Sequence, residues 1–380
     1  MTDKNKKEKV LVVGAVGSMI ANFNMENIHI LKNEGYDVEV AANFGDIDPI
    51  SNEKKDKMLD AFQREGVISH QIDFQRGIGS PVKNIQVILK LRKLISEKKY
   101  KFIHTNSPLA SALVRIANLH KQTKIIYTAH GFQFFKGGRK RDWLLFYPIE
   151  KILASQTDVL VTINEEDYTR AKKMGFKIVE KIPGVGVDIH KFRPCSEKIN
   201  NSNLDKLILL SVGELNNNKN HILVLEAIMN LINKQDIEYW ICGTGTNEDK
   251  YLEYINKNHL VREVKLLGYR SDINDILEKA HIFVFPSFRE GLSVSVIEAM
   301  AKGKPVLASN IRGNRDLIDN GKGGVLFNPA SSDQLTKILT DCMVNKEKLD
   351  EFGRYNLEKV KEYDIKNVNK RMVAIYRELY

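Results

Sequence analysis

Two glutamates, Glu290 and Glu298, stand with seven residues between them in a segment suited to phosphate chemistry. The apolar run at residues 281–285 predicts a buried strand, and a glycine turn then leads into a helix that ends near Lys302. The first amides of a helix have no partner within it and can bind phosphate, while carboxylates accept hydrogen bonds from hydroxyls. Eight helical steps would separate the two glutamates by about 12 Å. The spacing suits an extended ligand with hydroxyls at both ends and a diphosphate between them, although an accidental glutamate pair on a solvated helix face would give the same pattern.

Residues 282–308 together resemble the E-x7-E signature of the retaining GT-B glycosyltransferases of family 4. The strand before the glutamates and the sequence GKPV after them belong to that resemblance, which is moderate at residues 207–219 and 128–147 and looser elsewhere. It implies an α/β fold in which two Rossmann-like parallel-sheet domains face a cleft. It also implies transfer of a sugar from a nucleotide donor with retention at the anomeric carbon.

The resemblance assigns roles within the motif. Glu290 would bind hydroxyls of the donor sugar at the reacting centre, and Glu298 would bind the ribose. The amides of Gly291 and Leu292, with Ser293 next to them, would bind the diphosphate.

The bulk composition fits a folded protein of two domains, with 380 residues of which 43% are hydrophobic. Three scattered cysteines without a C-x-x-C pair indicate a reducing cytoplasm. The sequence contains no run of about 18 apolar residues, so we expect no membrane-spanning helix. Most of the net charge of +10 lies in the first half of the chain. This excess indicates an anionic partner, such as a membrane surface, a phospholipid-like substrate or a nucleic acid.

Short apolar runs alternate with helical patterns in both halves, as expected for parallel sheets built from βαβ units. Predicted strands cover residues 10–13, 38–41, 102–104, 124–128, 159–163, 207–212, 238–242, 264–267, 282–286 and 306–308. Predicted helices cover residues 27–34, 82–98, 110–119, 222–232, 249–258, 273–279 and 294–302.

These patterns predict a first domain at residues 1–187 and a second at residues 188–358. A polar linker rich in glycine and proline, at residues 183–205, joins them. Residues 359–380 have a basic, amphipathic helical pattern, and the resemblance implies that this helix packs back on the first domain.

Lys219 and Gly213 follow a predicted strand in the sequence LSVGELNNNKN. This segment resembles the phosphate-binding segment of the family, in which Lys219 would neutralise the leaving diphosphate. Glu214 stands where the family has an arginine, so one expected diphosphate contact is missing or comes from elsewhere. A surface lysine in a polar loop is the alternative.

Two further positions are weaker candidates for donor binding. Arg270 follows another predicted strand and resembles a loop near the nucleobase, although plain solvated charge explains it equally well. Gly17 lies in the turn VGAVGS, whose amides would approach the donor diphosphate or the acceptor unless the turn is only structural.

His130 ends a predicted strand and precedes a glycine, at the family position whose histidine faces the donor sugar. The resemblance implies that it orients the sugar at the reacting centre, although a lone histidine is more often structural. Asp46 and Asp48 have a D-x-D form, but no strand leads into them, so a surface loop is expected. We therefore expect no metal site and no cofactor.

Basic and aromatic residues alternate in the segment HGFQFFKGGRKRDWLLFY, residues 130–147. This mixture suits the headgroup region of an anionic membrane. The residues concerned are Lys136, Arg139, Lys140, Arg141 and Trp143. A helix that buries its own apolar face behind a solvated basic loop is the alternative, and residues 83–101 are basic too, with apolar residues expected in the core.

The aromatic segment is most similar to bacterial capsule and exopolysaccharide glycosyltransferases. The resemblance thus implies an enzyme peripherally associated with the inner face of the cell membrane. It would use a UDP-linked sugar and a polyprenyl-diphosphate-linked acceptor. A nucleotide-sugar epimerase of the same architecture is one rival. A basic nucleic-acid-binding protein is another, although no motif of that class is present.

Overall fold

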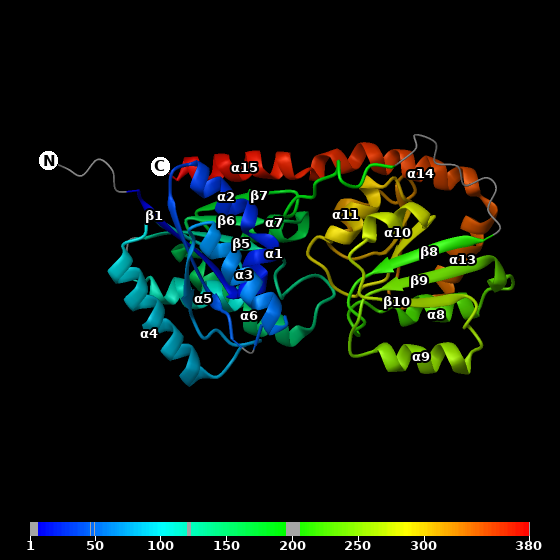
Figure 1. Ribbon diagram of the computed structural model, residues 1–380, viewed down its shortest axis with the longest axis horizontal. Helices are drawn as coiled ribbons and strands as arrows, with labels where there is room; N and C mark the ends of the chain where they lie inside the picture. The colour runs from blue at the N-terminus through cyan, green and yellow to red at the C-terminus, as the bar shows by residue number, and fades with distance from the viewer. Residues whose placement is uncertain (1–6, 46, 49, 120–122, 195–205, 380) are drawn as a thin grey trace. The chain divides into compact units, whose positions relative to one another are not determined.

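The computed structural model describes residues 7–45, 47–48, 50–119, 123–194 and 206–379, and it divides into two compact units (Figure 1). Unit 1 comprises Met1–Val185 and Asn369–Tyr380, and unit 2 comprises Gly186–Val368. The chain therefore leaves unit 1 near Val185 and returns to it within the last helix. Residues 195–205 of the expected linker lie outside the described residues.

Unit 1 is built on a seven-stranded parallel sheet in the order β3-β2-β1-β4-β5-β6-β7. Its strands are β1 (Lys9–Val16), β2 (Asp37–Asn43), β3 (Ile68–Gln71), β4 (Phe102–Thr105), β5 (Lys124–Ala129), β6 (Val159–Thr162) and β7 (Ile178–Lys181). Its helices are α1 (Gly17–Phe23), α2 (Met25–Asn33), α3 (Asn52–Arg64), α4 (Pro81–Lys98), α5 (Pro108–Ala117), α6 (Lys140–Leu153) and α7 (Glu165–Ala171), with a 3-10 turn η1 (Ala154–Gln156).

Unit 2 contains a six-stranded parallel sheet in the order β10-β9-β8-β11-β12-β13. Its strands are β8 (Leu207–Val212), β9 (Ile237–Cys242), β10 (Val264–Gly268), β11 (Ile282–Phe285), β12 (Val306–Ser309) and β13 (Gly324–Phe327). Its helices are α8 (Ile222–Met229), α9 (Glu248–Lys257), α10 (Ile273–Lys279), α11 (Val294–Ala301), α12 (Asn314–Leu317), α13 (Ser332–Val344) and α14 (Lys346–Lys359), with 3-10 turns η2 (Lys234–Asp236) and η3 (Val360–Tyr363).

Each sheet reverses its strand order at one point, between β1 and β4 in unit 1 and between β8 and β11 in unit 2. Loops that leave the carboxyl ends of strands diverge at such a point and open a crevice, where ligands of α/β sheets bind. The loops after β8 and β11 carry Lys219 and Glu290. The topology therefore places both residues at the switch point of unit 2.

The central strands are mostly apolar because helices cover both of their faces. In unit 2, Leu209, Ile241, Val284 and Leu307 are completely buried. The predicted strands match these central elements. The sequence reasoning missed β3 and β7, whose side chains are mostly exposed and therefore form no apolar run, and it missed β13, which begins at a glycine.

The expected terminal helix is interrupted. Helix α14 ends at Lys359, the turn η3 follows, and α15 (Ile365–Glu378) begins after Asp364. Within unit 1, the hydroxyl of Tyr376 lies 2.8 Å from Nδ1 of His104, and Nε2 of His104 lies 2.8 Å from Oγ1 of Thr128. Burial lowers the pKa of His104 to about 3, so the neutral ring accepts from Tyr376 and donates to Thr128. This chain of hydrogen bonds attaches α15 to β4 and β5.

Removal of the Tyr376 hydroxyl tests this attachment. Tyr376→Phe leaves Nδ1 of the buried His104 without a donor, so we expect the free energy of unfolding to fall by about 1–3 kcal/mol. Tyr168→Phe is the control in the same unit, because its hydroxyl makes no hydrogen bond to the described residues. Urea unfolding followed by circular dichroism measures both variants, and equal stability of the two would contradict the inferred attachment.

Candidate functional site

The loops after β8 and β11 are joined side by side at the switch point of unit 2. The amide of Phe288 donates to the carbonyl of Asn218 at 2.8 Å. The side-chain amide of Asn218 donates to the carbonyl of Arg289 at 3.0 Å, and that of Asn220 donates to the carbonyl of Pro286 at 3.1 Å. These asparagines hold the loop that carries Lys219 against the loop that carries Glu290. Sequence reasoning missed both, and the asparagine-rich string around Lys219 was the available signal.

Lys219 and Glu290 form an ion pair in which Nζ lies 2.8 Å from Oε1. Both side chains are largely buried, and the ammonium group also lies 4.7 Å from the centroid of the Phe285 ring. The two residues were expected to contact the diphosphate and the sugar of one ligand. The structure brings them together, so a ligand that takes either side chain must compete with the other.

The loop after β12 packs against the backbone of Glu290 and Gly291. The buried Arg312 donates from Nε to the carbonyl of Glu290 at 3.2 Å. Gly313 has a φ of +76°, and a β-carbon there would overlap the carbonyl oxygen of Gly291. Arg312 was not among the sequence candidates, because nothing in its local pattern shows a partner more than twenty residues away.

Helix α11 begins at Val294 with donors available to a ligand. Its N-cap residue, Ser293, makes no capping hydrogen bond from its side chain, and its hydroxyl lies 3.0 Å from that of Ser295. Within the part of the chain that the structure describes, the amides of Gly291, Leu292 and Val294 have no hydrogen-bond acceptor. The predicted phosphate-binding amides therefore lie next to the Lys219–Glu290 pair with their donors unused.

Glu298 lies in the second turn of α11, away from the ion pair. Burial raises the pKa of its carboxyl group to about 7, and the positive charge of Lys191 partly opposes that shift. A carboxyl group this close to neutrality is half protonated near pH 7. A partner that donates hydrogen bonds to Glu298 would favour the charged carboxylate over the protonated form.

Backbone contacts shape the remaining donor candidates of unit 2. Gly243, at the end of β9, has a φ of +149°, and a β-carbon there would overlap the carbonyl oxygen of Gly213. Arg270 is exposed and paired with Asp272, so its structural role is a surface ion pair beside α10. Glu214 is exposed and accepts from Asn216 at 3.0 Å. The structure thus supplies no cation at Glu214, whereas the buried Arg312 contacts the backbone of the loop that carries Glu290.

His130 belongs to unit 1, at the end of β5. Its Nε2 donates to Oδ1 of Asn106 at 3.4 Å, and its ring lies 6.1 Å from that of Phe23. Burial lowers the pKa of His130 to about 4. The ring is therefore neutral at pH 7 and acts as a hydrogen-bonding group rather than a cation.

Gly17 and Asp48 meet at the start of α1. Oδ2 of Asp48 accepts from the amide of Ser18 at 2.8 Å, and a β-carbon at Gly17 would overlap Phe44. The carboxylate of Asp48 occupies the position where a ligand anion was expected. The close packing against Phe44 explains why residue 17 is a glycine. Asp48 is buried, which corrects its interpretation as part of a surface loop. Asp46 lies outside the described residues.

Metal-binding groups are not gathered anywhere in the described residues, since no three of His, Cys, Asp and Glu stand close enough to hold an ion. Also within that part of the chain, no helix has both the length and the apolar composition that a membrane crossing requires. Cys242 and Cys342 are buried, unpaired thiols.

The basic segment before α6 is solvated. Arg139 and Arg141 are 65% and 73% exposed and lie 3.4 and 3.6 Å from the carboxylate of Asp142. Lys136 and Lys140 are exposed as well.

Trp143 does not share that exposure. Its indole donates to the carbonyl of Phe135 at 3.1 Å, and Arg170 covers the ring at 4.9 Å. The ring also packs against Phe134 and Tyr147. This packing leaves Trp143 only partly exposed. The exposed apolar residues of α6 are instead Leu144, Leu145, Ile149 and Ile152, which share one face of the helix.

The close approach of Gly313 to Gly291 gives a test of the loop packing. Gly313→Ala must move the carbonyl of Gly291, so we expect it to lower the free energy of unfolding by about 1–3 kcal/mol more than Gly321→Ala. Gly321 has a similar φ of +82° but no atom within 4 Å of its added β-carbon. Thermal or urea unfolding of both variants gives the comparison, and a smaller loss for Gly313→Ala would contradict this packing.

Two family models match most of the chain. The model for glycosyl transferases group 1 covers residues 193–359, and the model for glycosyltransferase family 4 covers residues 22–188. The chain is 34% identical over 335 residues to EpsD of Bacillus subtilis (strain 168), which covers 84% of this chain and 83% of EpsD. It is 31% identical over 284 residues to the UDP-Gal:alpha-D-GlcNAc-diphosphoundecaprenol alpha-1,3-galactosyltransferase of Escherichia coli, which covers 70% of this chain and 73% of that protein.

Solved structures share the architecture of both units. Anabaena Alr3699/HepE in complex with UDP has a TM-score of 0.75 at 16% identity and covers 97% of this chain and 100% of its own. Sucrose-phosphate synthase from Thermosynechococcus elongatus has a TM-score of 0.76 at 17% identity and covers 98% of this chain and 99% of its own. These likenesses confirm the predicted GT-B fold. From the family matches and the two relatives above 30% identity, the chain belongs to the bacterial GT-B glycosyltransferases of family 4.

Proposed function

We propose that this glycosyltransferase moves a sugar from a UDP-linked donor to a polyprenyl-diphosphate-linked acceptor, with retention, in the synthesis of a capsule or exopolysaccharide. The observation that carries the proposal is the Lys219–Glu290 pair beside the unused amides at the start of α11. One side chain suits a diphosphate, the other suits sugar hydroxyls, and both stand at the switch point of the sheet. The donor would bind to unit 2.

Lys219 would leave Glu290 when the donor arrives. Its ammonium group would bind the diphosphate together with the amides of Gly291 and Leu292 and, as the leaving group departs, would stabilise its charge. Glu290 would then accept hydrogen bonds from the donor sugar. Arg312 would hold the Glu290 loop in place, and neutral His130 would hydrogen-bond to the sugar. No residue in this scheme needs a metal ion or a cofactor.

The names of relatives support the choice of substrates. The Escherichia coli relative is a galactosyltransferase named for a UDP-linked donor and a diphosphoundecaprenol-linked acceptor. A Campylobacter jejuni relative, 29% identical over 235 residues, is named as an N-acetylgalactosaminyltransferase acting on a diphospho-undecaprenol-linked sugar. A lipid-linked acceptor would keep the enzyme at the cytoplasmic face of the cell membrane, bound there peripherally through the exposed cations Lys136, Arg139, Lys140 and Arg141.

Transfer of label tests the function. The full chain is incubated with a panel of radiolabelled UDP-sugars and a bacterial lipid extract in excess EDTA. We expect label in the chloroform–methanol phase, and about 10- to 100-fold less with Glu290→Gln or Lys219→Ala, because each loses a hydrogen bond to a charged group. Activity that requires added manganese would contradict the metal-free mechanism. Epimerised UDP-sugar without labelled lipid would favour the epimerase.

Protonation of Glu298 tests its contact with the ribose. With a pKa of about 7, the carboxyl group gains its charge between pH 6 and pH 8. Because the carboxylate is the better acceptor for two hydroxyls, UDP affinity should rise with pH in that window. Calorimetry with UDP measures this, and Glu298→Gln should show a weaker affinity whose change with pH is smaller. An identical pH profile in both proteins would exclude the contact.

Binding to vesicles tests the membrane surface. Each cation near an anionic membrane contributes about 1 kcal/mol, and salt screens it. Replacing Lys136, Arg139, Lys140 and Arg141 with Gln should therefore release the protein from phosphatidylglycerol vesicles in sedimentation. The matched control replaces four exposed lysines of unit 2, namely Lys250, Lys257, Lys322 and Lys337. Equal loss in both variants would leave only a general charge effect and contradict the assigned surface.

A further inference from the structure

A cavity of about 450 Å³ opens at the switch point of unit 1. The end of β1, the loop after β4 and the segment after β5 contribute Val16, Ser107 and Gln133 to its wall. The volume is within the range of about 300–1,000 Å³ that is typical of pockets for small organic ligands. Unit 1 therefore has a ligand-sized hollow at the position where α/β sheets bind ligands.

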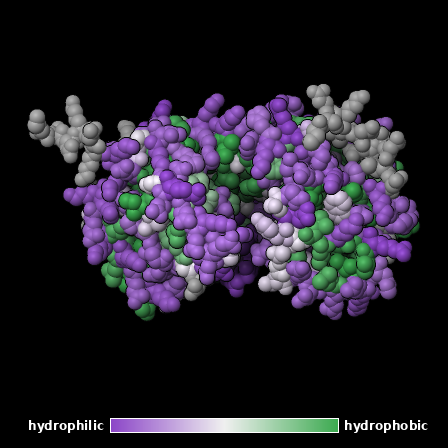
Figure 2. Space-filling view, viewed as in Figure 1, coloured by the Kyte–Doolittle hydropathy of each residue, from purple (hydrophilic) through white to green (hydrophobic). Residues whose placement is uncertain are grey.

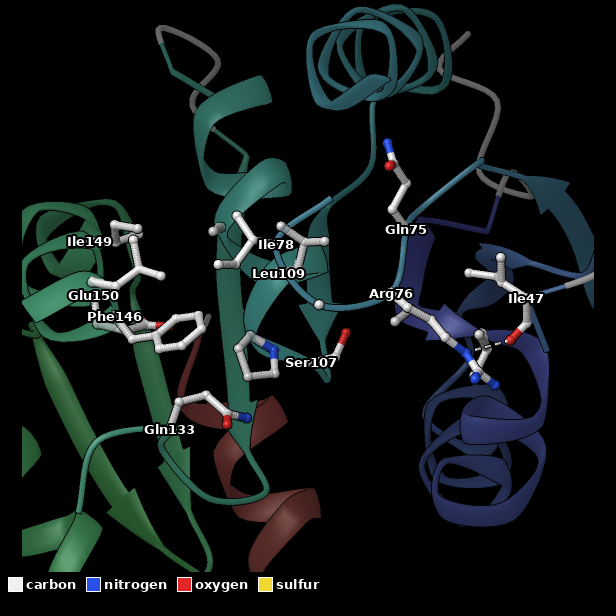
Figure 3. Close-up of a pocket in the computed structure, with 16 residues that line it drawn as sticks. Ile47, Gln75, Arg76, Ile78, Ser107, Leu109, Gln133, Phe146, Ile149 and Glu150 are labelled. Carbon is white, nitrogen blue, oxygen red and sulfur yellow. Dashed lines mark hydrogen bonds between the residues drawn. The ribbon is translucent and has the colours of Figure 1, made fainter. Parts of the chain in front are cut away.

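Apolar side chains form most of the wall. Figure 3 shows Ile78 and Leu109 on one side and Phe146 and Ile149 on the other. The acid among the lining residues, Glu150, is paired with the buried Arg115 at 2.8 Å. A sugar alone would leave its hydroxyls without partners against such a surface, so the cavity suits an apolar group.

A second hollow of about 270 Å³ adjoins the first, because Ile47 and Gln75 line both. Its wall includes the polar side chains of Asn43, Lys83 and Lys90. Lys90 is paired with Asp73 at 3.3 Å, whereas Lys83 makes no ion pair with any described residue. The two hollows together offer an apolar chamber with cations beside it.

Polar groups also line the first hollow. Arg76 donates from Nε to the carbonyl of Ile47 at 3.1 Å, as the dashed line in Figure 3 marks. The hydroxyl of Ser107 is buried and has no hydrogen-bond partner among the described residues. An anionic group that enters here would meet a guanidinium and an unused hydroxyl.

The helices beside the cavity expose further apolar residues. Val82, Ile85 and Leu89 of α4 are 65%, 57% and 58% exposed and follow one face of that helix. Ile149 and Ile152 of α6 are 38% and 73% exposed. In Figure 2, green hydrophobic side chains interrupt the hydrophilic surface of unit 1 in the region where Figure 1 places α4. An apolar chain that leaves the cavity would therefore still meet apolar surface.

We propose that the apolar cavity holds the first isoprene units of the acceptor's lipid and that Arg76, Ser107 and Lys83 contact the adjoining diphosphate. This inference rests on the proposed function and adds a specificity determinant to it. The enzyme would recognise the carrier lipid itself, in addition to the sugar that accepts the transfer. An isoprenoid diphosphate matches the site because it joins an apolar chain to a compact anion.

Calorimetry on the full chain tests the cavity without any transfer. Farnesyl diphosphate, inorganic diphosphate and dodecyl phosphate are the probes, each below its micellar concentration. We expect farnesyl diphosphate to bind at least tenfold more tightly than inorganic diphosphate, because only it fills the apolar chamber. The variant Leu145→Gln/Ile149→Gln, which changes two lining residues, should remove that difference.

The variant Leu144→Gln/Ile152→Gln is the matched control, because it changes the same residue types on the same helix outside the cavity. It should bind farnesyl diphosphate like the unchanged protein. Equal affinities for farnesyl diphosphate and inorganic diphosphate, or equal losses in both variants, would overturn the inference. Dodecyl phosphate binding as tightly as farnesyl diphosphate would assign the cavity to a fatty chain and overturn it as well.

Labelled transfer to extracted lipid, measured in parallel, separates the inference from the proposed function. Transfer that proceeds although farnesyl diphosphate does not bind would reject the cavity assignment and leave the glycosyltransferase function in place. Farnesyl diphosphate binding without transfer to any extracted lipid would support the cavity and count against the proposed acceptor.

Discussion

The candidate site of unit 2 depends on loops whose backbones touch, with no room between them for a side chain. Gly243 packs on the carbonyl of Gly213, and Gly313 packs on the carbonyl of Gly291. These contacts draw the loops after β8, β9, β11 and β12 into one layer at the carboxyl edge of the sheet. Within that layer, Nζ of Lys219 and Oε1 of Glu290 lie 2.8 Å apart.

The Lys219–Glu290 ion pair reduces the cost of burying two charges when no ligand is bound. The ion pair satisfies two largely buried charges in the absence of substrate, which would otherwise be costly. The proposed nucleotide-sugar would offer a diphosphate to Lys219 and hydroxyls to Glu290, so each side chain would exchange one polar partner for another. The amides at the start of α11 have no such partner in the described residues, and their hydrogen bonds to phosphate would be a net gain.

Unit 1 has the same kind of switch point, with different side chains around it. Its switch point is lined by apolar side chains from α5 and α6 rather than by an ion pair. The anion position at the start of α1 is already taken by Asp48. The two halves of the chain thus repeat one fold plan, but their loops carry the Lys219–Glu290 ion pair in unit 2 and a mostly apolar cavity wall in unit 1.

The sequence predicted the central strands and the motif from Glu290 to Glu298 because both are local patterns. A strand buried on two faces is apolar throughout, and the glutamates follow such a strand at a fixed spacing. The exposed edges β3 and β7 carry no such pattern. Asn218 and Arg312 were missed because their partners lie about seventy and twenty residues away in the chain.

Helix faces posed a different problem for sequence reasoning. The pattern of α4 contains apolar residues on more than one side, and the sequence assigned them all to the core. In the structure α5 packs on α4, so Val87 and Leu91 are buried while Val82 and Leu89 are exposed. The packing of Trp143 likewise depends on Arg170 and Phe134, which no local pattern could connect to it.

A crystal structure of the full chain with UDP and a non-transferable UDP-sugar tests the central claim most directly. The account predicts that the diphosphate lies against Lys219 and the first amides of α11, that the ribose lies against Glu298, and that the Lys219–Glu290 contact is broken. A nucleotide bound elsewhere in unit 2, with that ion pair intact, would contradict it.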